Sequence, residues 1–133
     1  MATIGDHDLL VAYDDTDAGR RAAEFAAERA AQTGESVTVI HIGSDLSEAE
    51  MRDAIEEPFA SHGVPVSFRM FDIGGSEDEN ISIRAKLGGI IDQHDYTMIV
   101  MGNEKHSLFH GLTEGSVSGA VIDDQVVPVL LVP

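Results

Sequence analysis

The segment Leu9–Gly34, LLVAYDDTDAGRRAAEFAAERAAQTG, contains a strand pattern followed directly by a helix pattern. Its first five residues form an unbroken apolar run, which is typical of a strand that is buried on both faces of a parallel sheet. From Asp17 the alanine-rich pattern predicts a helix that ends at Gly34 as its C-cap. We expect one helix face to carry Ala18, Ala22, Phe25, Ala26 and Ala30. A buried strand joined to an amphipathic helix favours the α/β class.

The same alternation continues to the end of the chain. We predict further strands over residues 36–42, 65–71, 96–101 and 126–132. A capping box at Ser47 and Glu50 begins a second helix, which ends at Gly63, and helices are also predicted over residues 80–94 and 116–124. With right-handed crossovers this order gives a doubly wound, Rossmann-like parallel sheet of five strands in the order 3-2-1-4-5, with helices on both faces. We expect residues 1–133 to form a single domain.

The first and fourth strands of such a sheet are neighbours, so their carboxyl ends, at Asp14 and Gly102, should lie side by side. A ligand is expected at this point, where the winding direction reverses. The segment 101–117, MGNEKHSLFHGLTEGSV, leads from the fourth strand to a helix start at Gly115 and Ser116. Free backbone N–H groups and the positive end of a helix dipole can hold a phosphate there.

The two glycines of this loop have a simpler explanation as well. Gly102 is predicted to leave the strand with a dihedral angle that other residues resist, and Gly115 to let backbone approach a ligand closely. Both could instead serve only to make turns.

Acidic residues follow the first strand as well. Asp14 could contact a ligand or could serve in a helix cap and turn, while Thr16 and Asp17 are favoured as the caps of the first helix. The doublet Asp14-Asp15 could hold a Mg²⁺ ion beside a bound phosphate. His41, within a strand pattern, is predicted to be a hydrogen-bonded core residue.

Composition excludes several classes of function. The chain has 133 residues, no cysteine, and a formal net charge of -16 from 24 acidic and 8 basic residues. Disulfides and zinc–thiolate sites are therefore excluded, and the charge opposes binding to nucleic acid or an anionic membrane. No signal-peptide or membrane-spanning pattern is present, so we expect a soluble cytoplasmic protein.

The acidic excess has two explanations. It could form an interaction surface for a basic partner, or it could reflect adaptation to a salt-rich cytoplasm, where a Debye length of about 3 Å at 1 M screens the self-repulsion. We favour salt adaptation, because dispersed carboxylates with few lysines resemble the composition of proteins from extreme halophiles.

The strand and helix segments, together with IVMG, GSVSGAVI and PVLLV, resemble the universal stress protein family over nearly the whole chain. The family's nucleotide motif is Gly, two residues, Gly, nine residues, Gly-Ser/Thr. Gly102, Gly115 and Ser116 match this motif at the same spacing, but Lys105 replaces its second glycine. The resemblance implies an ATP site, a homodimer that pairs through the last strand, and a set of nucleotide contacts: Ala12, Asp14, Ile42, Met101, Gly102, Gly115, Ser116 and Val117.

Lys105 leaves the nucleotide site open to two interpretations. Its ammonium group could bind a β- or γ-phosphate, or its side chain could mark a member that has lost ATP. Three functions therefore remain: an adenine-nucleotide-binding stress protein, a nucleotide-free dimeric regulatory module, and, least favoured, a slow ATPase. We expect no catalytic residues and no resident metal site, and a metal at the pair His106 and His110 is disfavoured.

Overall fold

A computed structural model describes residues 8–42, 46–71, 89, 96–102 and 128–133 of the chain. It contains the strands β1 (Asp8–Ala12), β2 (Ser36–Ile42), β3 (Val66–Phe71), β4 (Tyr96–Gly102) and β5 (Val129–Val132), and the helices α1 (Asp17–Thr33) and α2 (Glu48–His62). None of the helices within these residues is long and apolar enough to cross a membrane.

The five strands form one sheet in the order β3-β2-β1-β4-β5, and all neighbouring strands are parallel. This confirms the predicted fold class and strand order. β3 and β5 are the edge strands, as the predicted order requires. β5 begins immediately after Pro128, because proline has no N–H group to donate within the sheet.

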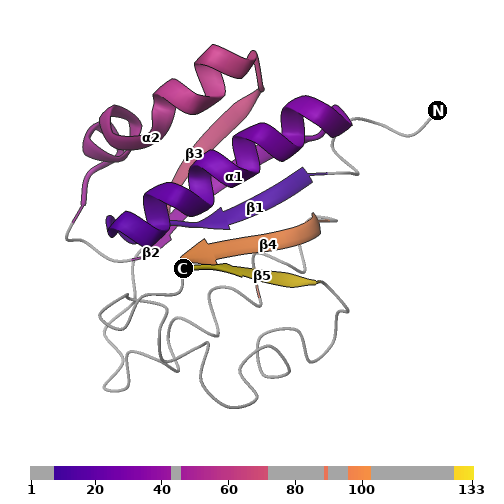
Figure 1. Ribbon diagram of the computed structural model, residues 1–133. Coiled ribbons are helices and arrows are strands. Elements are labelled where there is room, and N and C mark those ends of the chain that lie inside the picture. Colours follow the sequence, from indigo (N-terminus) through magenta and orange to yellow (C-terminus); the bar gives the residue numbers. More distant parts are fainter. Residues whose placement is uncertain (1–7, 43–45, 72–88, 90–95, 103–127) are drawn as a thin grey trace.

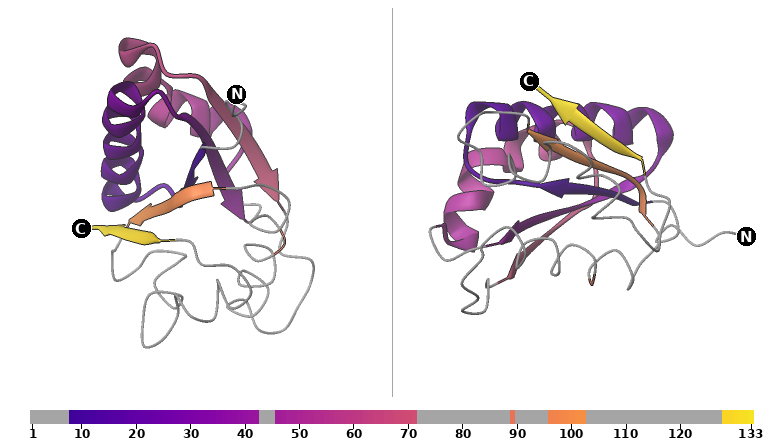
Figure 2. Two further views of the ribbon diagram at one scale, coloured as in Figure 1. Left: turned by 90° about the vertical axis from the view of Figure 1, so that its right-hand side faces the viewer. Right: turned by 90° about the horizontal axis from the view of Figure 1, so that it is seen from below.

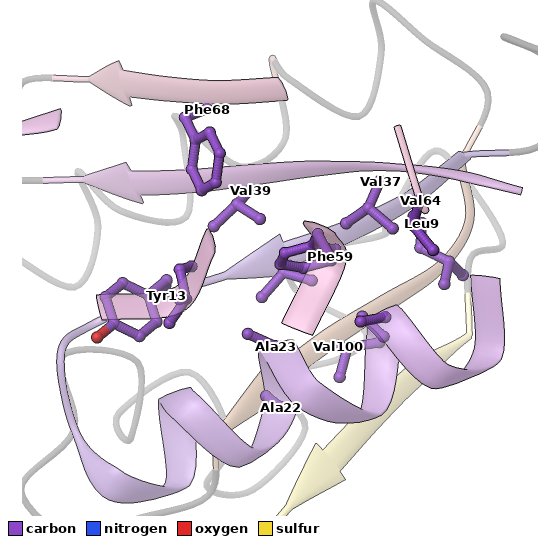
Figure 3. Packing of buried hydrophobic residues seen from close by; sticks show 14 of the residues in the cluster. Leu9, Tyr13, Ala22, Ala23, Val37, Val39, Phe59, Val64, Phe68 and Val100 are labelled. Carbon is purple, nitrogen blue, oxygen red and sulfur yellow. The ribbon is translucent and has the colours of Figure 1, made fainter. Parts of the chain in front are cut away.

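Helices α1 and α2 lie on the same side of the sheet and pack against each other (Figures 1 and 2). The predicted helices 80–94 and 116–124 lie outside the described residues, apart from Gly89, which is helical. The core between the two helices and the sheet contains alternate strand residues such as Leu9, Val37 and Val39, together with Phe59 of α2 (Figure 3).

Small side chains let α1 approach both the sheet and α2. Its buried residues are Ala18, Gly19, Ala22, Ala23, Ala26, Ala27 and Ala30. Phe25 is 36% exposed, so its predicted place on the buried face was wrong. The buried arc is centred on the Ala22–Ala26 side, and Phe25 lies at its margin, beyond Ala18.

Capping residues fix the ends of both helices as predicted. The Thr16 hydroxyl accepts a hydrogen bond from the Gly19 N–H group, and Gly34 ends α1 with φ 80°. In α2, Ser47 and Glu50 form a reciprocal capping box, and Gly63 ends the helix with φ 67°. These positive φ angles favour glycine, which has no Cβ to clash with the backbone.

Candidate functional site at the carboxyl ends of β1 and β4

The first arm of the candidate site is the turn that follows β1. Asp14 is 8% exposed, and its Oδ1 atom lies 2.7 Å from the Thr16 hydroxyl. The same hydroxyl accepts a hydrogen bond of 2.9 Å from the Gly19 N–H group. Thr16 is therefore the N-cap, as predicted, and Asp14 supports the cap without being it.

Asp15 has different partners from Asp14. Its Oδ1 atom accepts hydrogen bonds from the Tyr13 hydroxyl at 2.9 Å and from Arg20 Nη2 at 3.2 Å, and its φ is 60°. Burial, together with the hydrogen bond to Asp15 and the charge of Asp15, raises the pKa of Tyr13 well above its usual value. Asp14 Oδ1 thus accepts from Thr16, whereas Asp15 Oδ1 accepts from Tyr13 and Arg20. No cluster of three metal-ligating side chains occurs among the residues that the structure describes.

The second arm is the end of β4, which pairs with β1 so that Ala12 lies opposite Met101. The carboxyl ends that lead to Asp14 and Gly102 are therefore adjacent, as predicted (Figure 1). Gly102 does not have a positive φ, so the predicted reason for this glycine was wrong. A Cβ atom at Gly102 would lie 2.6 Å from both Ala18 C and Gly19 N, and the missing side chain is what lets β4 approach the first turn of α1.

β2 supplies the third side of the site. Ile42 is buried at the last position of β2, and Ala12 and Met101 are buried at the ends of β1 and β4. His41 is fully buried, and its Nδ1 atom lies 2.7 Å from the Tyr13 carbonyl oxygen, which can only accept. His41 therefore donates this hydrogen bond within the core, as predicted, and ties β2 to the turn that carries Asp14.

The structure thus brings Ala12, Asp14, Met101 and Gly102 together and places Ile42 at the end of β2, next to β1. The other predicted site residues, Lys105, Gly115, Ser116 and Val117, lie outside the described residues, as do His106 and His110. Sequence reasoning missed Gly19, although a glycine in the first turn of an otherwise alanine-rich helix is a usable signal, since it lowers helix propensity.

A second group of polar residues lies at the opposite, amino-terminal end of the sheet. Glu35 is 8% exposed and accepts hydrogen bonds from the hydroxyls of Thr33, at 2.7 Å, and Thr97. Burial acts to raise the pKa of Glu35, but the two hydrogen bonds and the charge of Arg29 outweigh it, so this pKa lies below its ordinary value. Asp8 accepts a hydrogen bond from the Ser36 hydroxyl nearby.

An open groove of about 530 Å³ lies between α1 and α2. Charged groups of both signs line it over an apolar floor: Arg20, Glu24, Glu28, Ala54, Ile55, Glu57, Pro58, Ser61 and His62. None of the predicted site residues lies in this lining. The carboxyl ends of β1, β2 and β4 remain the candidate site, because parallel sheets bind ligands where their winding reverses.

Solved structures with the same fold include several universal stress proteins. A universal stress protein in complex with cAMP is 21% identical, with a TM-score of 0.67, and the match covers 96% of each chain. One from Archaeoglobus fulgidus in complex with dAMP is 23% identical, with a TM-score of 0.60, over 96% of this chain and 98% of that chain. Another from Archaeoglobus fulgidus is 24% identical, with a TM-score of 0.58, over 96% of this chain and 93% of that chain.

At the level of sequence, no curated protein matches the chain significantly. The family model for universal stress proteins, in contrast, matches residues 7–62 and 79–133. These two ranges include six of the seven described helices and strands, and only β3 lies between them. The chain therefore belongs to the universal stress protein family.

Proposed function

We propose that the protein binds an adenine nucleotide at the carboxyl ends of β1, β2 and β4. The observation that carries this proposal is the pairing of β1 with β4, which brings Asp14 beside Gly102, the first glycine of the nucleotide motif. Family membership and the fold shared with proteins in complex with cAMP and dAMP support it.

Each site residue has a proposed role. Asp14 contacts the nucleoside beside Ala12, the backbone of Ile42 contacts adenine, and Met101 belongs with the loop around the ribose and the phosphates. Gly102 begins the loop, and Gly115, Ser116 and Val117 close it around the ribose and the phosphates with backbone N–H groups. Such groups bind phosphate without a basic side chain, which suits a protein with a net charge of -16.

The arginines support a phosphate site made by this loop. Among the residues that the structure describes, every arginine contacts a group of the protein itself. Arg20 pairs with Asp15 and Asp17, and Arg21 donates to the Pro133 carbonyl oxygen. The others pair with carboxylates or lie over rings: Arg29 with Glu35, Arg52 with Glu48 and the Phe68 ring, and Arg69 with the Phe71 ring. We propose that Lys105, which stands at the position of the motif's second glycine, supplies the cation for a β- or γ-phosphate, and we expect ATP, with Mg²⁺, as the ligand.

Calorimetric titration with Mg-ATP and with AMP in molar KCl tests the proposal. We expect binding of both nucleotides by the wild-type protein and none by Gly115→Val, since a branched side chain would fill the loop. Lys105→Ala should weaken ATP binding more than AMP binding, because only ATP carries the β- and γ-phosphates. Absence of heat and of a thermal shift with either nucleotide would favour a nucleotide-free regulatory module. We expect hydrolysis of ATP by the protein to be slow or absent, because the slow ATPase is the least favoured of the three functions.

We also propose a homodimer that forms through β5. This strand is a sheet edge, and Leu131 on it is 37% exposed, so an unpaired β5 would leave an apolar edge in water. Analytical ultracentrifugation should show a dimer for the wild-type protein and a monomer for Leu131→Asp. Ser67→Asp on the opposite edge strand, β3, is the control and should remain dimeric. A monomeric wild-type protein would contradict this proposal.

A further inference from the structure

The Thr16 hydroxyl determines the direction of two hydrogen bonds. It carries one hydrogen and accepts from the Gly19 N–H group at 2.9 Å. Since a carboxylate only accepts, the hydroxyl hydrogen must point to Asp14 Oδ1, at 2.7 Å. A backbone group of α1 is thereby connected to the Asp14 carboxylate through a single side chain, and Thr16 is half-buried where it makes both contacts.

Gly19 leaves the space that the Asp14 carboxylate occupies. A Cβ atom at Gly19 would lie 2.8 Å from Asp14 Oδ1, 3.2 Å from Thr16 Oγ1 and 3.3 Å from Tyr13 Cδ1. The contact at 2.8 Å is shorter than Cβ contacts in proteins, so Asp14 Oδ1 would have to shift to admit any side chain at this position, and Thr16 Oγ1 and Tyr13 Cδ1 would have to adjust slightly as well. Glycine is less favourable than alanine inside a helix, and at Gly19 that cost has a local reason.

The same turn of α1 also contacts the other arm of the candidate site. The backbone at Ala18 and Gly19 lies against Gly102, where a Cβ would meet it at 2.6 Å. The first turn of α1 therefore lies between Asp14 on one side and the beginning of the nucleotide loop on the other. Its small residues set how far apart these two arms are.

From these contacts we infer that Thr16 and Gly19 are positioning residues that fix the Asp14 carboxylate and thereby set nucleotide affinity. Thr16 donates a hydrogen bond to the carboxylate and so contributes to its orientation, and Gly19 leaves the space for it. The inference rests on the proposed function in that Asp14 contacts the nucleoside. The inference adds Thr16 and Gly19 to the candidate site as residues that act through Asp14 and do not contact the ligand.

Two substitutions at Thr16 separate orientation from helix capping. Thr16→Ser keeps the hydroxyl, and Thr16→Asp keeps an N-cap acceptor for Gly19 but has no hydrogen to donate and repels Asp14. We expect Thr16→Ser to bind AMP as the wild type does and Thr16→Asp to bind at least about tenfold more weakly, the size of a lost hydrogen bond to a charged group. Equal affinities of the two variants would overturn the role of Thr16.

A substitution at Gly19 reaches the same carboxylate from the other side. Gly19→Ala should keep the helix, because alanine favours it, yet lower AMP affinity by a similar factor. Gly89→Ala is the matched control, since Gly89 is helical and a Cβ there meets nothing within 4 Å. In an Asp14→Asn background, Gly19→Ala and Thr16→Asp should have little further effect on affinity, because both act through Asp14. If the losses of affinity caused by Gly19→Ala or Thr16→Asp added fully to the loss caused by Asp14→Asn, the two residues would not act through Asp14.

A measurement without nucleotide separates this inference from the proposed function. Scalar couplings in the NMR spectrum report the χ1 rotamer of Asp14 in the free protein. We expect one rotamer in the wild type and in Thr16→Ser, and a changed or averaged rotamer in Thr16→Asp and Gly19→Ala. If the wild type binds no nucleotide but the rotamer changes as described, only the proposed function fails. If the rotamer is the same in all four proteins, the positioning inference fails.

Discussion

The effect of a missing side chain is clearest at Gly102. The sequence predicts that Gly102 is needed for its dihedral angle. In the structure its φ is not positive, and the missing side chain instead allows a close contact between β4 and α1. The atoms that a Cβ would meet are backbone atoms of a helix, which cannot rotate away. Replacing Gly102 by a residue with a side chain therefore tests directly how closely the end of β4 must pack against the first turn of α1.

We expect Gly102→Ala to lower the free energy of unfolding by about 1–3 kcal/mol, the usual cost of forcing an extra carbon into a packed site. Urea denaturation followed by circular dichroism measures this change. Gly89→Ala serves as control and should be neutral or stabilising, because the exposed helical position gains propensity without a clash. Equal stabilities of the two variants would show that β4 and α1 can separate at no cost.

Glu35 gives the protein a pH dependence that can be assigned to one residue. Because the hydrogen bonds from Thr97 and Thr33 and the charge of Arg29 lower the pKa of Glu35 in the folded state, the folded protein binds this proton less readily than the unfolded chain. The stabilisation is fully present above the ordinary carboxyl value of about 4.5 and is lost as the pH falls through the lower folded value.

We expect the thermal midpoint of the wild type to fall more steeply below pH 4.5 than that of Glu35→Gln. Glu28→Gln removes one negative charge from an exposed position of α1 and should follow the wild-type profile. Differential scanning calorimetry between pH 3 and 7, where the lowered pKa of Glu35 takes effect, provides the comparison. Parallel profiles of wild type and Glu35→Gln would mean that the contacts of Glu35 do not contribute to the loss of stability at low pH.

Local contacts at the residue scale could be predicted, and distant ones could not. Thr16 as an N-cap and His41 as a hydrogen-bonded core residue follow from neighbouring residues or from a strand pattern. The pairing of Glu35 with Thr97 joins residues 62 positions apart and depends on the registers of β2 with β1 and of β1 with β4, which no pattern specifies. The role of Gly19 likewise depends on where Asp14 lies in space.

At the scale of the element, caps determine the helix boundaries that the sequence predicts well. Both helices begin at a Ser or Thr that accepts from its third following N–H group and end at a left-handed glycine. Phe25 was misplaced because periodicity gives the direction of an apolar face but not its width. α1 packs against the sheet and α2 together, so its buried arc shifts toward α2 and leaves Phe25 at the rim.

The capping box of α2 can be tested alone. Ser47→Ala should cost about 1 kcal/mol of unfolding free energy, because the Glu50 N–H group loses its acceptor at the helix start. Ser61→Ala, in the last turn of the same helix, is the control, since its hydroxyl only makes an exposed bond of 3.3 Å to the Pro58 carbonyl oxygen. Chemical denaturation of both variants distinguishes them, and a larger loss for Ser61→Ala would contradict the assignment.

For the whole molecule, the sheet order could be predicted because few topologies join alternating strands and helices with right-handed crossovers. The charge distribution is a separate property of the whole chain. With a net charge of -16, repulsion among carboxylates opposes the compact state, and most of the described arginines already pair with carboxylates. Dissolved cations must therefore supply much of the remaining screening.

We expect the unfolding midpoint to rise substantially between dilute buffer and molar KCl, since a Debye length of about 3 Å at 1 M confines the repulsion to near neighbours. Thermal unfolding by circular dichroism at several KCl concentrations measures the shift. Sucrose at matched osmolality is the control for nonspecific exclusion effects and should give a smaller rise. Identical midpoints in dilute buffer and KCl would refute adaptation to salt.

The position of β1 between β2 and β4 also has a consequence for how the polypeptide matures. β2 follows β1 after one helix, whereas β4 begins only at Tyr96. On the ribosome, the edge of Leu9–Ala12 that later joins β4 stays unpaired until residues 96–102 have been synthesised. We expect nascent chains shorter than this to be the most prone to aggregation and the most dependent on chaperones.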